Sequence, residues 1–236
     1  MRPDHRANDA LRPVSIVRNY TKFAEGSVLV SFGDTKVICT ASFDKQVPPF
    51  LRDTGTGWIT AEYAMLPRST QERNIRDNMR KGRALEIGRV IGRALRSVVD
   101  LPAMGERQII IDCDVIQADG GTRTAAITGA YVALHDAFCR LVDNGILSRS
   151  PLAGQCAAVS LGVVDGELLL DLCYQEDFRA EVDMNLVMLE NETIIELQGT
   201  AERKAFPRAV LNHMLDLGTQ GIRQLVAIQN EALGRA

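Results

Sequence analysis

The chain has 236 residues, of which 46% are apolar and 24% are charged. This composition is ordinary for a soluble globular protein, and the length predicts one or two domains with a sizeable core. No run of about 18 apolar residues is present, which excludes a membrane-spanning helix, and the polar start from Met1 to Arg6 lacks the apolar core of a signal peptide. Five widely spaced cysteines, mostly in apolar runs, indicate reduced thiols in a cytoplasmic protein rather than a disulfide framework or a zinc site.

The charge is unevenly distributed along the chain. The formal net charge is −3, but residues 66 to 96 carry a net +6, so the rest of the chain carries −9. Such asymmetry favours a local site for a polyanion on an otherwise acidic body.

The first half predicts strands followed by helices. Residues 27–32 and 36–41 alternate apolar and polar side chains around Gly33-Asp34-Thr35, which is typical of a hairpin. A short strand is expected over residues 58–65, a helix over 84–99, a buried strand over 108–117 and a helix over 123–143 that ends near Asn144-Gly145.

The second half repeats this order. Strands are expected over residues 156–164, 167–174, 180–189 and 193–199, and a long helix over 207–233, bent near Gly218 and Gly221. Strands followed by a helix, twice, predict an α+β or α/β body with two similar halves. The break near residues 148–151 gives expected domains of 1–150 and 151–236.

The most informative segment is Gln-Ala-Asp-Gly-Gly-Thr-Arg-Thr, residues 117–124. A strand, a glycine turn and a helix start make an anion site, because the first helical N–H groups have no internal partner and the helix dipole is positive there. Gly121 lets a phosphate approach the backbone, Thr122 can donate its hydroxyl, and Arg123 can offer two parallel N–H donors. The alternative is a plain strand-to-helix turn.

Two carboxylates form a second candidate group. Asp177 and Asp183 stand six residues apart, so an extended segment would place both on one face of a strand. Paired carboxylates can hold Mg²⁺, or one can act as a general acid, and the alternative is a solvated strand edge.

Several motifs in the same order resemble the ribonuclease PH family of phosphate-dependent 3′ exoribonucleases. The motifs are Leu11-Arg12-Pro13, residues 25–30, residues 33–39, residues 57–63, residues 65–68, residues 117–124, residues 180–185 and residues 196–200. The resemblance implies the α+β ribonuclease PH fold, with two similar β-α halves (each similar to domain 2 of ribosomal protein S5) in one compact subunit.

The resemblance also implies roles for the candidate residues. Asp177 and Asp183 correspond to catalytic and metal-binding aspartates, and Arg83 completes the phosphate pocket with Gly121, Thr122 and Arg123. The stretch before Arg83 is shorter than the family's, so Arg80 or Lys81 is an alternative to it. The family's small residue after the first aspartate is replaced here by Phe178.

An arginine-rich segment completes the expected site. Arg68, Arg73, Arg76 and Arg80 lie in a polar stretch, and together they predict a clamp on tRNA phosphates, with a solvated loop as the alternative. Aromatic residues make up only 5% of the chain, so stacking on bases is expected to be limited to single residues such as Phe50 or Tyr63.

The resemblance to this family implies that the protein trims the 3′ ends of tRNA and other structured RNA, including rRNA, by phosphorolysis. Inorganic phosphate would be the co-substrate, nucleoside diphosphates the products, and nucleotide addition the reverse reaction. It also implies a cytoplasmic homohexamer, a trimer of dimers. The first alternative is a catalytically silent, RNA-binding ring subunit of an exosome-like assembly, and the second is a domain of a polynucleotide phosphorylase.

Overall fold

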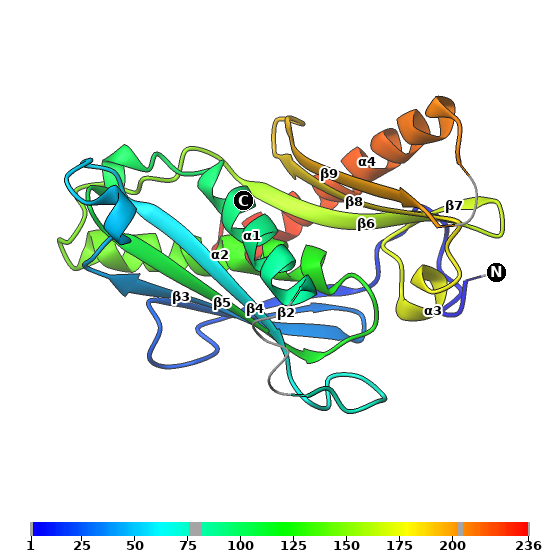
Figure 1. Ribbon diagram of the computed structural model, residues 1–236, viewed down its shortest axis with the longest axis horizontal. Coiled ribbons are helices and arrows are strands. Elements are labelled where there is room, and N and C mark those ends of the chain that lie inside the picture. The colour runs from blue at the N-terminus through cyan, green and yellow to red at the C-terminus, as the bar shows by residue number, and fades with distance from the viewer. Residues whose placement is uncertain (1, 76–81, 203–204, 236) are drawn as a thin grey trace.

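A computed structural model describes residues 2–75, 82–202 and 205–235. Two β-sheets enclose helices, with the first sheet below and the second above in the view of Figure 1. The first sheet has the order β1-β2-β3-β5-β4, and its strands are Val14–Arg18, Gly26–Phe32, Thr35–Asp44, Gln108–Gln117 and Trp58–Met65 in that order. All its pairings are antiparallel except that between β4 and β5.

The second sheet is antiparallel and has the order β7-β6-β8-β9. Its strands are Glu167–Leu170, Cys156–Val164, Val182–Leu189 and Ile194–Ala201 in that order. The helices are α1 (Arg83–Arg96), α2 (Thr122–Asp143), α3 (Tyr174–Asp177) and α4 (Arg208–Leu233), and short 3₁₀ turns cover Pro49–Leu51 and Pro102–Met104.

Helix α2 lies at the centre of the molecule. It packs against β2 and β3 of the first sheet and against β6 of the second, while α1 packs on β4 and α4 on β6 and β8. Alanine, glycine and other small residues let both sheets approach α2, and nearly every residue of its first four turns is buried. A helix buried on all sides is apolar all round, which explains why its sequence shows no polar face.

The predicted α+β architecture, with strands followed by a helix in each half, is confirmed. The predicted hairpin forms with Gly33 and Asp34 at its turn, and strands β4, β5 and β6 have the predicted bounds. Helix α4 runs unbroken through Gly218 and Gly221, where Leu186 and Leu170 pack against the glycines.

Two features differ from the expectation. The strand predicted over residues 167–174 ends at Leu170, because Asp171 has a φ of 55° and residues 174–177 form α3. Strand β1, which sequence patterning did not predict, adds an edge to the first sheet.

Of the free cysteines, Cys39, Cys113 and Cys156 are buried, whereas Cys139 is exposed. Within the described ranges, no helix is long and apolar enough to cross a membrane.

The packing of β2 on α2 yields a stability prediction. A Cβ at Gly26 would lie 1.8 Å from the carbonyl oxygen of Ala133, so Gly26→Ala must push the strand and the helix apart. Overpacking of this kind costs about 1–3 kcal/mol or more. Chemical denaturation should show this loss for Gly26→Ala and a much smaller change for Gly199→Ala, whose Cβ would meet atoms at 3.8 Å or beyond. Equal stabilities of the two variants would contradict the close packing.

Candidate active site

The glycine turn before α2 has the geometry of an anion site. Gly120 and Gly121 have φ values of 74° and 63°, in the left-handed region that favours glycine. A Cβ on Gly120 would lie 2.6 Å from the carbonyl oxygen of Leu172, so the turn also packs tightly against the second half of the chain. The first α-helical hydrogen bond runs from the N–H of Ala125 to Gly121, which leaves the N–H groups of residues 122–124 directed out of the helix end.

The hydroxyl of Thr122 is already engaged. It lies 2.7 Å from the hydroxyl of Tyr63, and both side chains are buried. Burial raises the pKa of Tyr63, which therefore stays protonated and can donate this hydrogen bond to Thr122. Because Tyr63 is 4% exposed, the prediction that it stacks on a base is wrong; it helps to fix the start of α2 instead.

Arg123 points toward the second sheet. Its Nη1 donates to Oε1 of Gln198 on β9 and lies 3.4 Å from Oε1 of Glu86 on α1. Gln198 in turn donates to the same Glu86 oxygen at 3.0 Å. These contacts hold one edge of the guanidinium. Among the described residues, its Nε and Nη2 have no hydrogen-bond partner, so they can donate hydrogen bonds to an anion.

The two candidate aspartates come together from different elements. Asp177 ends α3 and Asp183 lies on β8, so the prediction that both lie on one extended face is wrong. Their charges nonetheless interact. Burial and the negative charge of Asp177 raise the pKa of Asp183 to about 6. Burial also raises the pKa of Asp177, and the positive charges of Arg83 and Arg123 partly offset this rise.

Arg83 is the first residue of α1 and is exposed. Its charge acts on Asp177, Asp183 and Tyr63, so it lies within range of charge interaction with these three side chains. The alternatives, Arg80 and Lys81, lie outside the described residues.

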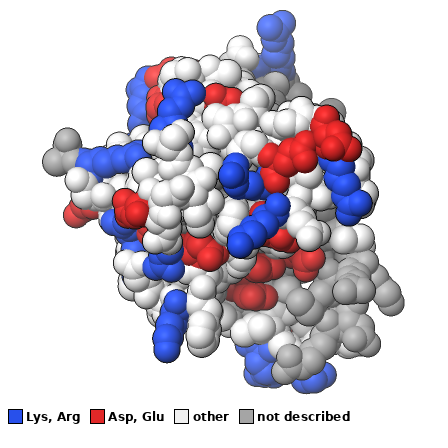
Figure 2. Space-filling model, turned by 90° about the vertical axis from the view of Figure 1, so that its left-hand side faces the viewer, with Lys and Arg blue, Asp and Glu red and all other residues white. Residues whose placement is uncertain are grey.

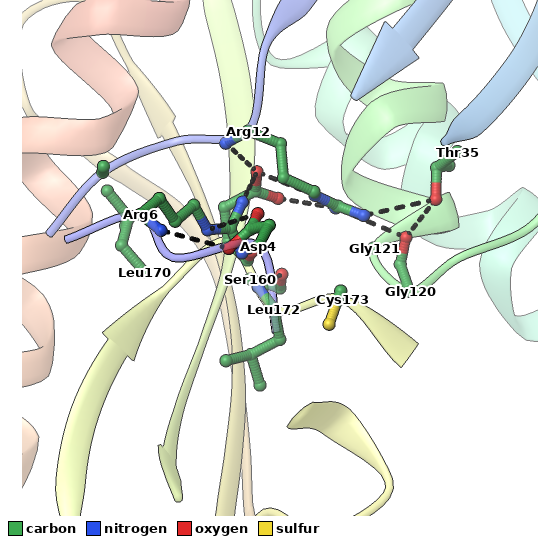
Figure 3. A network of polar contacts seen from close by, with 12 residues as sticks. Asp4, Arg6, Arg12, Thr35, Gly120, Gly121, Ser160, Leu170, Leu172 and Cys173 are labelled. Carbon is green, nitrogen blue, oxygen red and sulfur yellow. Dashed lines mark hydrogen bonds and ion pairs between the residues drawn. The ribbon is translucent and has the colours of Figure 1, made fainter. Parts of the chain in front are cut away.

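A buried ion pair fixes the glycine turn to the second half of the chain (Figure 3). Arg12 donates from Nε and Nη2 to the two carboxylate oxygens of Asp171 at 3.0 and 2.7 Å. The same guanidinium donates to the carbonyl oxygen of Asp119 at 2.5 Å, and Thr35 donates to that of Gly120 at 2.6 Å. Burial alone would lower the pKa of Arg12, but the hydrogen bonds and charge of Asp171 raise it overall, so the pair stays ionised.

The N-terminal segment also anchors α3, which lies beside the N-terminus in Figure 1. Arg2 forms a bidentate pair with Glu176 at 2.8 and 2.9 Å, and Glu176 also accepts the N–H of Cys173 at 3.0 Å. Burial would raise the pKa of Glu176, but these partners lower it to about 2. Because Asp177 follows Glu176, this anchor sets the position of its carboxylate.

Part of the predicted arginine clamp is described. Arg68 and Arg73 are exposed in the segment after β4, whereas Arg76 and Arg80 lie outside the described residues. On the face of the molecule in Figure 2, basic side chains are scattered among acidic ones, so the described side chains form no broad basic surface there.

A separate acidic hollow of about 220 Å³ opens on the first sheet and is lined partly by Glu62, Asp112 and Asp114. Burial and the neighbouring carboxylates raise the pKa of Asp112, and burial raises that of Asp114. Crowded carboxylates repel phosphate, so this hollow is not the anion site.

Sequence reasoning missed the residues that hold the site in place. Gln198 and Glu86 orient Arg123, and Arg12, Asp171 and Thr35 hold the glycine turn. Arg12 and Gln198 lie inside motifs that resemble the ribonuclease PH family, which was the available signal. Asp171 lies in an apolar run, and a charge there signals a buried partner.

Comparison with protein-family models identifies both halves of the chain. Domain 1 of the 3′ exoribonuclease family, RNase PH, matches residues 10–139, and domain 2 of the same family matches residues 154–221.

Solved structures share the fold at low identity. Rrp46 from rice (Oryza sativa) is 21% identical with a TM-score of 0.79, and the match covers 98% of this chain and 100% of that chain. A chain of the Archaeoglobus fulgidus exosome with RNA bound to the active site is 21% identical with a TM-score of 0.80, covering 96% and 91%. A chain of an archaeal exosome core is 20% identical with a TM-score of 0.76, covering 98% and 91%.

The raised pKa of Asp183 yields a prediction for stability against pH. Its pKa of about 6 in the folded state exceeds the unfolded value of about 3.9, so the charged carboxylate destabilises the fold increasingly from about pH 4 to pH 6 and fully above pH 6. Asp183→Asn should therefore raise the melting temperature at pH 7.5 in a metal-free buffer, and this gain should vanish near pH 4. The exposed Asp216→Asn on α4 serves as control and should change little at either pH. A gain that is the same at both pH values would contradict the assignment.

Proposed function

The chain belongs to the 3′ exoribonuclease family, and on this premise we propose that it shortens RNA from the 3′ end by phosphorolysis. The proposed substrates are tRNA precursors and other structured RNA 3′ ends, including rRNA, and the products are nucleoside diphosphates. Nucleotide addition to a 3′ end is the reverse of the same reaction.

One observation carries the proposal. Arg123, in the first turn of α2, and Arg83 both lie close enough to Asp177 and Asp183 for their charges to interact. A site for an anionic nucleophile thus lies beside carboxylates that can assist the leaving group. This combination suits transfer between phosphates, whereas an anion site alone would suit binding.

Each group has a task in the reaction. The backbone N–H groups of residues 122–124 and the open edge of Arg123 hold inorganic phosphate, and Arg83 offsets the charge of the attacked phosphodiester. An oxygen of the phosphate attacks the last phosphorus of the RNA, and the bond from this phosphorus to the 3′ oxygen breaks. The 3′ oxygen takes a proton, and the terminal nucleotide leaves as a nucleoside diphosphate. When no cation is bound, Asp183, whose pKa is about 6, can supply that proton at mildly acidic pH.

A magnesium ion fits the carboxylates. Asp177 and Asp183 repel each other, which is one cause of the raised pKa of Asp183, and a cation between them would relieve this repulsion. Among the described residues, no group of three or more His, Cys, Asp or Glu side chains could hold a metal ion. Mg²⁺ commonly binds one or two carboxylates together with substrate phosphates, so these two residues are sufficient ligands. When bound, the ion would supply positive charge to the developing oxyanion.

We further propose a cytoplasmic homohexamer built as a trimer of dimers. The chains of similar fold include Rrp46 and subunits of exosomes, which supports a ring-like assembly. Exposed Arg68 and Arg73 would hold the tRNA body by its phosphates, together with Arg76 and Arg80.

A second candidate is a catalytically silent subunit that binds RNA. The contacts that Glu86 and Gln198 make to Arg123 favour it, because they occupy one edge of the group that would bind phosphate. Arg123, Asp177 and Asp183 are all present, however, and a silent subunit has no need of them. Phosphate-dependent product formation distinguishes the two functions.

The first functional prediction separates chemistry from binding. Asp177→Asn and Asp183→Asn should each lower the single-turnover rate of trimming by about 10²-fold or more, because a positioned acid or metal ligand is lost. RNA binding should stay the same or strengthen, since a repelling charge is removed. Rates are measured on a tRNA with a 3′ extension, with and without inorganic phosphate, and the released mononucleotide is identified.

Asp216→Asn on α4 should retain the full rate in this assay. Release of monophosphates without phosphate would show a hydrolase, and no release at all from the unaltered protein would favour the silent subunit. Near-normal rates in both Asn variants would make the two aspartates structural.

The second functional prediction concerns the arginine segment. Replacing Arg68 and Arg73 by Ala should weaken tRNA binding and reduce the slope of log affinity against log salt by up to about 0.9 for each lost phosphate contact. Arg149→Ala is a matched control, because Arg149 is also exposed and pairs only with the exposed Asp100 among the described residues. An unchanged slope in the double variant would indicate a solvated segment.

A further inference from the structure

Tyr174, the first residue of α3, and Phe178, which directly follows the helix, form an exposed aromatic pair. The rings of Tyr174 and Phe178 are 6.2 Å apart between centroids and tilted by 35°. Tyr174 is 57% exposed and Phe178 is 77% exposed. Large apolar side chains in water stabilise the fold little, so their presence on a four-residue helix has no evident structural reason.

The pair lies next to Asp177 by the geometry of the helix. Residues 174 and 177 are three apart, and residues 174 and 178 are four apart, so all three side chains share one side of α3. Asp177 also interacts with the charges of Arg83 and Arg123, so α3 lies near the proposed reaction centre.

The backbone of the pair is fixed to the phosphate turn. The N–H of Tyr174 donates to the carboxylate of Asp119 at 3.2 Å, and the Tyr174 nitrogen would lie 2.8 Å from a Cβ built on Gly120. Glu176, between the two aromatic residues, is buried and paired with Arg2. The rings are therefore presented on a rigid support, which reduces the entropy lost when a flat group binds them.

We propose that Tyr174 and Phe178 form a stacking platform for a nucleobase near the 3′ end of the RNA. The platform rests on the proposed function, because it supposes that RNA approaches Asp177. Every base presents a flat face to an aromatic ring, so the platform accepts different sequences and positions the strand rather than reading it. It extends the site beyond the phosphates to the base of the nucleotide.

The test measures binding without turnover. Fluorescence anisotropy gives the affinity of the protein for a labelled single-stranded RNA, in buffer without phosphate and without metal ions. The unaltered full chain is used in the assembly that it forms in solution. Phe178→Ala should weaken binding about five- to tenfold, at the lower end of the effect of one stacked base. Phe178→Trp should restore it. Phe23→Ala is the matched control, since Phe23 is 89% exposed in the loop between β1 and β2 and should have no effect.

Abasic RNAs identify the stacked position. Each RNA of the series lacks the base at one of its last few nucleotides. At the stacked position, the unaltered protein should lose affinity, and the difference between it and Phe178→Ala should disappear. A difference that persists with every abasic RNA, or no loss of affinity in Phe178→Ala, would overturn the platform.

Two further readouts separate this proposal from others. If the unaltered protein trims RNA with phosphate and Phe178→Ala matches it in both KM and binding, the platform fails while the proposed function stands. If no trimming occurs but the abasic coupling is found, the proposed function fails while the platform stands. Light scattering of Phe178→Ala covers the remaining case: a changed particle mass would show that Phe178 packs against another subunit, which would overturn the platform.

Discussion

The buried pair between Arg12 and Asp171 is the constraint on which the site depends. Its two carboxylate contacts join the N-terminal segment to the second sheet, and the same guanidinium binds the carbonyl of Asp119 at the start of the glycine turn. Removing one member would leave the other charged, buried and unpaired, which costs about 3–5 kcal/mol in such pairs. The pair therefore fixes where the open end of α2 lies relative to α3, and this relation defines the proposed reaction centre.

The site joins groups of opposite charge that would not remain close without such support. The helix end and Arg123 attract anions, whereas Asp177 and Asp183 repel them, and burial together with the charge of Asp177 raises the pKa of Asp183 to about 6. Glu86 and Gln198 hold Arg123 at one edge of its guanidinium. The arrangement destabilises the fold but favours the proposed reaction, because fixed charges lie where negative charge develops on the leaving oxygen.

Local patterns account for the parts of the fold that the sequence could predict. The hairpin depends on Gly33 and its flanking alternation, and the anion site depends on Gly120, Gly121 and the helix that follows; both signals lie within a few residues. The region after Leu170 was wrongly predicted as a strand, because its apolar run continues while Asp171 is drawn into a pair with a residue 159 positions away. The same holds for Gln198, whose contact with Arg123 exists only once the second sheet has packed near α1 and α2. The role inferred for Phe178 likewise required knowing that its ring is exposed beside Asp177.

The positions in the chain of the pairs Arg2–Glu176 and Arg12–Asp171 also determine when the site can form during synthesis. Arg2 and Arg12 leave the ribosome first, but Glu176 and Asp171 follow only 174 and 159 residues later. Domains emerge in order from the N-terminus, so the first half can build its sheet around α2 while its arginines still lack their carboxylates. Closure of such a long loop comes late in folding, because many residues must be ordered before the contact forms. A nascent chain that stops before residue 171 can therefore contain the glycine turn and Arg123 while it still lacks Asp171, Asp177 and Asp183. The complete proposed site forms only when the second half docks.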